Sequence, residues 1–138
     1  MENEHTVLYQ LTETSPFMMS FVVITKQNNA IIIDGGMEAD MPLLKEYVGN
    51  RHVSAWILTH AHSDHIDGFV SEMRKNGGKD FDIEKIYYNF PPYSLIEKHD
   101  VPDYEYFKSE LDEMLPAFDE VLPLFRDKTH IVTQGESI

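Results

Sequence analysis

The chain contains no cysteine, a single tryptophan, and only 11 lysine and arginine residues against 24 aspartates and glutamates. The absence of cysteine excludes disulfide bonds, thiolate metal ligands and a thiol nucleophile, so any metal must be bound by histidine, aspartate or glutamate. The formal net charge of −13 argues against a nucleic-acid-binding protein, because phosphate affinity depends on clustered lysine and arginine. The positions of the seven histidines therefore matter most.

Long apolar runs are missing as well. No stretch approaches the roughly 20 apolar residues that a membrane span requires. The acidic N-terminal segment lacks the basic and apolar regions of a secretory signal. We therefore predict a cytoplasmic protein without a membrane partner, and its 138 residues suit one domain.

Apolar periodicity predicts alternating strands and helices. Short β-branched or alternating segments predict strands over residues 7–11, 21–25, 30–33, 53–59 and 83–90, and from residue 131 onward. Residues 7–11 should bury one face, and the second and third segments should form a hairpin. Three helices are expected, the first with Asp40 as its N-cap, the second ending at Gly77 and the third beginning at Asp103. This order predicts an α/β domain with a mixed sheet.

Four potential metal ligands lie where the strand over residues 53–59 meets the second helix: His60, His62, Asp64 and His65. His60 and His62 are two residues apart on an extended segment, so their rings point to the same side and can share one cation. The turn into the helix should direct Asp64 and His65 away from that pair. This arrangement predicts two adjacent metal positions, as in hydrolases whose two ions lie about 3.5–4 Å apart. Single histidines at strand ends are usually structural, but this spacing favours a metal site.

The segment from Thr59 to Gly68, THAHSDHIDG, resembles the H-x-H-x-D-H motif of the metallo-β-lactamase superfamily at every defining position. The upstream IIIDGG, from Ile31 to Gly36, resembles the family's strand followed by Asp-Gly. The resemblance implies an αββα sandwich, of which this chain provides the N-terminal half, a mixed sheet with flanking helices. We therefore expect residues 1–138 to form a single domain that is shorter than the family's complete fold.

The resemblance also implies a role for each matched residue. His60 and His62 would bind the first metal and Asp64 and His65 the second, and Asp64 would be the catalytic residue that orients the bridging hydroxide. Asp34 would hydrogen-bond near the ligands and hold their loop, although a plain Asp-Gly turn is the alternative. One or two zinc ions are expected, because His62 stands where the family's diiron branch has an acidic residue. Iron and manganese are the alternatives.

The ligands of the family's second half have no counterpart in this sequence. Downstream of His65 only His99 and His130 remain, and neither stands in the Gly-His-Thr context of the family's third histidine. We expect His99 to be solvated. Each metal is then left with two ligands, fewer than the three that catalytic zinc uses. A half sandwich should also expose an apolar sheet face, which favours a homodimer or a swapped dimer.

The remaining candidates have simpler interpretations. Trp56 is expected in the core, whereas the loop Phe90-Pro91-Pro92-Tyr93 could be either a pocket wall or a rigid turn. The acidic residues of the second half are interpreted as solvated surface: Asp80, Asp82, Glu84, Asp103, Glu105, Glu110, Asp112 and Glu113.

These observations predict a metal-dependent hydrolase in the full-length parent. A metal-bound hydroxide would attack an ester, thioester, lactone or phosphodiester in a small-molecule substrate, and the acidic surface counts against polynucleotides. The alternative is a non-catalytic or incomplete half-domain that needs a second segment or a partner chain to complete the metal site.

Overall fold

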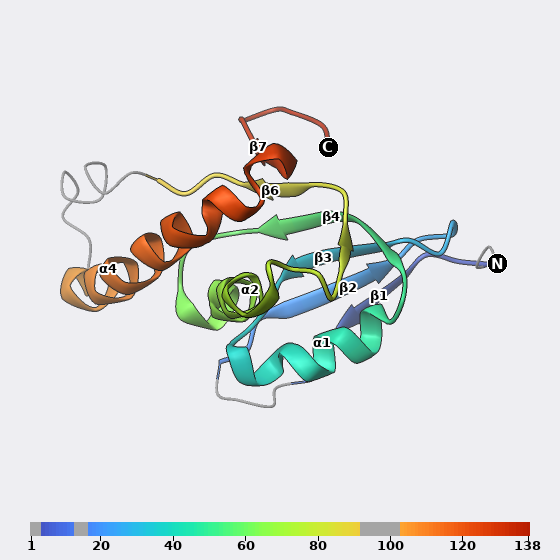
Figure 1. Cartoon of the computed structure of the whole chain (residues 1–138), viewed down its shortest axis with the longest axis horizontal. Helices are drawn as coiled ribbons and strands as arrows, with labels where there is room; N and C mark the ends of the chain where they lie inside the picture. Colours follow the sequence, from blue (N-terminus) through green and yellow to red (C-terminus); the bar gives the residue numbers. More distant parts are fainter. Residues whose placement is uncertain (1–3, 13–16, 92–102) are drawn as a thin grey trace.

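The computed structural model describes residues 4–12, 17–91 and 103–138. Within these ranges the chain forms a seven-stranded mixed sheet flanked by helices (Figure 1). The strands are β1 (Val7–Gln10), β2 (Ser20–Ile24), β3 (Ala30–Asp34), β4 (His52–Leu58), β5 (Asp82–Ile83), β6 (Ile86–Tyr88) and β7 (Thr129–Ile131). The helices are α1 (Met41–Val48), α2 (Ser63–Asn76) and α4 (Tyr104–Val121), with 3-10 turns η1 (Glu38–Asp40), η2 (Leu122–Leu124) and η3 (Arg126–Lys128). No helix in these ranges has the length and apolarity that a membrane span requires.

The strand order is β1-β2-β3-β4-β6-β7, and β5 pairs with β4 beside this path. The pairs β1–β2 and β2–β3 are antiparallel. The pairs β3–β4, β4–β5, β4–β6 and β6–β7 are parallel. The predicted hairpin is confirmed as β2–β3. The strand predicted over residues 83–90 is instead the two short strands β5 and β6. Glu84 and Lys85 interrupt it, although Glu84 N–H still donates to Val53 and the Lys85 carbonyl accepts Trp56 N–H, each at 2.9 Å.

Strand β1 corrects the prediction of one buried face. All four of its residues are exposed, Leu8 to 62%. The physical reason is that β1 is an edge strand that α1 reaches through Tyr47, whose ring centroid lies 5.1 Å from that of Tyr9, while an open hollow of about 530 Å³ lies beside Val7 and both tyrosines. Leu11, directly after the strand, is the buried residue of this segment.

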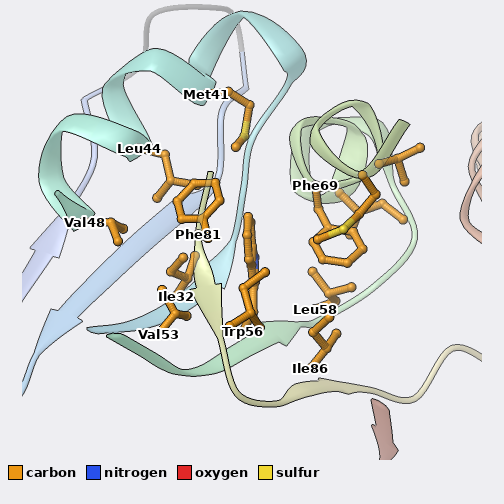
Figure 2. Close-up of a cluster of buried hydrophobic side chains, with 14 of the residues drawn as sticks. Ile32, Met41, Leu44, Val48, Val53, Trp56, Leu58, Phe69, Phe81 and Ile86 are labelled. Carbon is orange, nitrogen blue, oxygen red and sulfur yellow. The ribbon is translucent and has the colours of Figure 1, made fainter. Parts of the chain in front are cut away.

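One face of the sheet packs against the helices and forms the core. Ile32 of β3, Trp56 of β4 and Ile86 of β6 meet Leu44 of α1 and Phe69 of α2 (Figure 2). Trp56 is fully buried, as predicted, and its ring lies edge-on to that of Phe69 with centroids 5.0 Å apart. This packing holds the start of α2 close to the end of β4. We call this the covered face.

The opposite face is also apolar but lies outside the core. We call it the open face: Leu8, Phe21, Val23, Ile31, Ile33, Ala55, Ile57 and Tyr87. The strand register aligns Phe21, Ile33, Ile57 and Tyr87 in one row across four strands. Among the described residues, the core cluster contains side chains from α1, α2 and α4 but none from this row. Such a face is what the sequence predicts for half of an αββα sandwich.

Candidate metal centre

The H-x-H-x-D-H residues lie between the end of β4 and the first turn of α2 (Figure 1). His62 keeps an extended backbone, with φ −103° and ψ 153°, and is the N-cap of α2. The ring centroid of His60 is 4.6 Å from that of His62 and 3.8 Å from that of His65. Three imidazoles therefore cluster beyond the carboxyl end of β4.

The ring of His65 lies back beside His60, whereas the turn was predicted to direct it away. The cause is Asp34, whose Oδ2 lies 2.7 Å from Nδ1 of His65. The Oδ2 atom of Asp64 is 3.5 Å from the other ring nitrogen, Nε2. A hydrogen bond from Nδ1 to a carboxylate fixes the tautomer and the orientation of a metal-binding histidine. This contact therefore leaves Nε2 of His65 available to a ligand.

Asp34 supports the histidine segment from the end of β3. The side chain is only 2% exposed. Its Oδ1 accepts the N–H of Thr59 at 2.8 Å, and its Oδ2 accepts the Thr59 hydroxyl at 2.7 Å. Its φ of 57° is left-handed, a conformation that aspartate tolerates better than most residues. Asp34 thus contacts the histidine segment directly, which a plain Asp-Gly turn would not require.

Glycines allow α2 to approach the turn that follows β3. Gly35 N–H donates to the carbonyl of His65 at 2.7 Å, and Gly68 N–H donates to that of Gly36 at 2.8 Å. A Cβ atom on Gly68 would lie 2.7 Å from the carbonyl oxygen of Gly35, closer than such atoms approach. The backbone itself therefore sets the first turns of α2 against Asp34.

The electrostatics of His60 favour a neutral ring. Burial, and then the neighbouring imidazoles of His65 and His62, lower the pKa of His60 from its ordinary value of 6.5. Neutral imidazole is the form that binds metals, and imidazole with carboxylate is a donor set that zinc accepts. Within the described ranges, however, no three His, Asp or Glu side chains are placed to hold one ion together. The described motif therefore brings imidazoles and a carboxylate together without placing three of them on one ion.

Of the two later histidines, only His130 lies within the described residues, and it does not join the cluster. His130 lies on β7, where its Nε2 pairs with Glu136. His99 lies outside the described residues. The expectation that His99 is solvated therefore stays a prediction.

Seven of the acidic residues that were interpreted as solvated surface are exposed: Asp80, Asp82, Glu84, Asp103, Glu105, Asp112 and Glu113. Glu110 is the exception and corrects that interpretation. It is half-buried, and its Oε2 accepts the N–H of Ser63 at 3.2 Å and the Ser63 hydroxyl at 2.8 Å. Phe107, one turn earlier on α4, stacks on His62 with ring centroids 5.5 Å apart. Sequence reasoning missed both residues, because 47 positions separate Glu110 from Ser63 and no local pattern links them.

A hollow of about 290 Å³ adjoins the histidine cluster. It is lined by Phe17, Met37, His62, Ser63, Asp64, Tyr106 and Glu110. Phe90 and Pro91 line a different hollow of about 370 Å³, together with residues of α4 and none of the motif histidines. Pro92 and Tyr93 lie outside the described residues. The pocket-wall interpretation of this loop is thus supported for its first two residues, at a hollow away from the motif.

A mixed sheet with flanking helices and an H-x-H-x-D-H cluster at the end of a strand defines a class of metallohydrolase folds. The chain matches the family model of the metallo-beta-lactamase superfamily over residues 15–136. It belongs to that superfamily, whose members are usually hydrolases. No curated protein sequence matches the chain significantly.

Among solved structures, the chain is similar to AidC, a dizinc quorum-quenching lactonase in complex with a product, N-hexnoyl-L-homoserine. The two share 19% sequence identity and superpose with a TM-score of 0.60. The superposition covers 88% of this chain and 45% of the lactonase chain, so the present chain spans less than half of that structure. At this identity the likeness shows the fold alone.

Proposed function

We propose that this chain supplies the metal-binding half of a zinc-dependent hydrolase that acts on an ester, thioester, lactone or phosphodiester. The observation that carries the proposal is the cluster of His60, His62 and His65, with His65 oriented by Asp34. In this proposal His60 and His62 bind one ion, and Asp64 and His65 bind a second.

Zinc, when bound, supplies Lewis acidity and an activated water at neutral pH. The residues of the chain prepare the site for that chemistry. Asp34 accepts a hydrogen bond from the Nδ1–H group of His65, which leaves Nε2 as the ring nitrogen that can bind an ion. The Asp64 carboxylate lines the adjoining hollow, where it can accept a hydrogen bond from the attacking water and orient it.

The adjoining hollow favours a neutral substrate over an anionic one. Phe17, Met37 and Tyr106 offer apolar surface, whereas Asp64 and Glu110 place carboxylates at the same hollow. The net charge of −13 also repels anions at long range. Neutral esters and lactones are therefore preferred over phosphodiesters, and the lactonase activity named for AidC agrees with this preference.

A second candidate is a non-catalytic half-domain whose metal site is completed by a further segment or by a partner chain. One observation motivates it. The described residues place no three ligands on one ion. Under this candidate the chain binds zinc weakly and turns over no substrate by itself.

Metal analysis and an activity panel test both candidates. We expect zinc to copurify with the wild type and with the control His52→Ala, and the zinc content to fall in the double variant His60→Ala, His62→Ala, which keeps only the proposed ligands of the second ion. Equal zinc in all three proteins would contradict the metal site. Hydrolysis of a neutral ester or lactone that disappears in the double variant supports the enzyme. Zinc binding without hydrolysis of any substrate in the panel supports the half-domain.

A further inference from the structure

We propose that helix α4 positions the histidine motif, with Glu110 capping α2 and Phe107 stacking on His62. Through these two contacts α4 sets the place of His62 relative to His60 and increases the affinity of that pair for zinc. The inference rests on the proposed function, because zinc is the ligand whose affinity is at stake.

Helix α2 begins without a side-chain cap of its own. His62 occupies the N-cap position but makes no capping hydrogen bond with its side chain. The first N–H groups of a helix have no acceptor within the helix and require one from elsewhere. Glu110 supplies it to Ser63 from α4, and its negative charge also suits the positive end of the α2 dipole.

Phe107 contacts the side chain of His62, and Glu110 accepts hydrogen bonds from Ser63, the next residue along the chain. Residues three apart lie on the same face of a helix, so Phe107 and Glu110 both face the start of α2. The ring of Phe107 lies within 24° of parallel to that of His62. Two residues of α4 therefore fix this point of the chain, one through the backbone of Ser63 and the other through the ring of His62.

Helix α4 can provide this support because further contacts anchor it on α2. The buried ring of Phe118 lies 6.3 Å from that of Phe69 between centroids. Near the far end of α2, Arg74 pairs with Glu120 at 2.6 Å. Helix α4 thus contacts α2 along most of its length. The N-terminal part of α4 contacts the residues that are proposed as ligands.

The sharpest test removes the cap while keeping the rest of α4. We compare Glu110→Ala and Glu110→Gln with Glu113→Ala, which removes an exposed acidic side chain from the same helix. Amide hydrogen exchange of Ser63 is measured in the metal-free protein, and zinc affinity by competition with a chelating dye. We expect Glu110→Ala to speed Ser63 exchange and to weaken zinc binding by about tenfold or more, as residues that support metal ligands do. Glu110→Gln should keep most of the wild-type protection of Ser63 and most of the zinc affinity, because its amide oxygen still accepts a hydrogen bond.

Phe107→Leu gives a second test that does not depend on how the Glu110 variants fold. We expect the ring protons of His62 to lose the ring-current shift caused by Phe107, and zinc affinity to fall while the thermal midpoint of the metal-free protein changes little. An unchanged His62 signal would overturn the stacking contact.

Several outcomes would overturn the proposal. Unchanged Ser63 exchange in Glu110→Ala would show that the cap is not formed. Faster exchange with unchanged zinc affinity would show that the cap stabilises α2 but does not position the ligands. An equal loss of zinc affinity in Glu113→Ala would show that the loss follows from removing any negative charge from α4. If the wild type bound no zinc, the proposed function would fail, together with the affinity claim. The exchange and ring signals of the metal-free protein would still decide whether α4 positions His62.

Discussion

The covered and open faces of the sheet are formed by the same strands but have different surroundings. Ile32, on the covered face, is 0% exposed, whereas its neighbour Ile33, on the open face, is only half-buried. Both faces are nonetheless apolar, and Ile31, Ile32 and Ile33 form an unbroken isoleucine run in β3. Continuous apolar strands are typical of sheets that are covered on both sides. The difference teaches that the strands are suited to a layer on each face of the sheet. Among the described residues, helices cover only one of the two faces.

The largest expected effect is on the free energy of unfolding, when an isoleucine of the covered face and one of the open face are each shortened to alanine. Ile32→Ala should lower the free energy of unfolding by about 3–4 kcal/mol, because it leaves a cavity in the core. Ile33→Ala should lower it by about 1 kcal/mol, because less apolar surface returns to water. Equilibrium unfolding in urea measures both. Equal losses would show that the open face is as deeply buried in solution as the covered one.

A smaller effect is expected on self-association. We expect the chain to form homodimers through the open face, because contiguous apolar surface favours association. Ile57 lies in the aligned row between Ile33 and Tyr87, so Ile57→Thr should weaken association by about tenfold, or about 1.4 kcal/mol. Sedimentation velocity over a concentration series measures this. The control Leu124→Thr removes an apolar side chain that is 58% exposed outside the sheet and should change nothing. A wild type that stays monomeric throughout would contradict the expectation.

The smallest effect concerns His52, at the polar border of β4. Hydrogen bonds to Glu84 and Asp82 raise the pKa of His52 above its ordinary value of 6.5. The stabilisation is therefore fully present below about pH 6.5 and is lost as the pH rises through the folded-state pKa. Because the side chain is 37% exposed, we expect only a few tenths of a kcal/mol. The stability difference between wild type and His52→Gln should shrink from about pH 5.5 to about pH 8.5. A constant difference would contradict this account.

Sequence reasoning succeeded where the determining interactions are local. The β2–β3 hairpin and the buried stripe of α2, formed by Ile66, Phe69, Val70 and Met73, follow from residue spacing alone. It failed for β1, because alternation cannot say how much of an edge strand a helix covers. It also failed for Glu110, because a charged residue on a helix normally faces water and nothing nearby in the sequence marks its partner.

The sequence by itself determined the candidate donor atoms of the proposed metal site and their local setting. Without cysteine, imidazole and carboxylate are the donors, and the spacing of His60, His62, Asp64 and His65 places them where a strand turns into a helix. Tertiary structure decided which groups support them. Asp34 meets His65 across 31 residues and Glu110 meets Ser63 across 47. The physical reason is that periodicity specifies short-range backbone structure, whereas contacts between distant segments depend on how the helices pack on one face of the sheet.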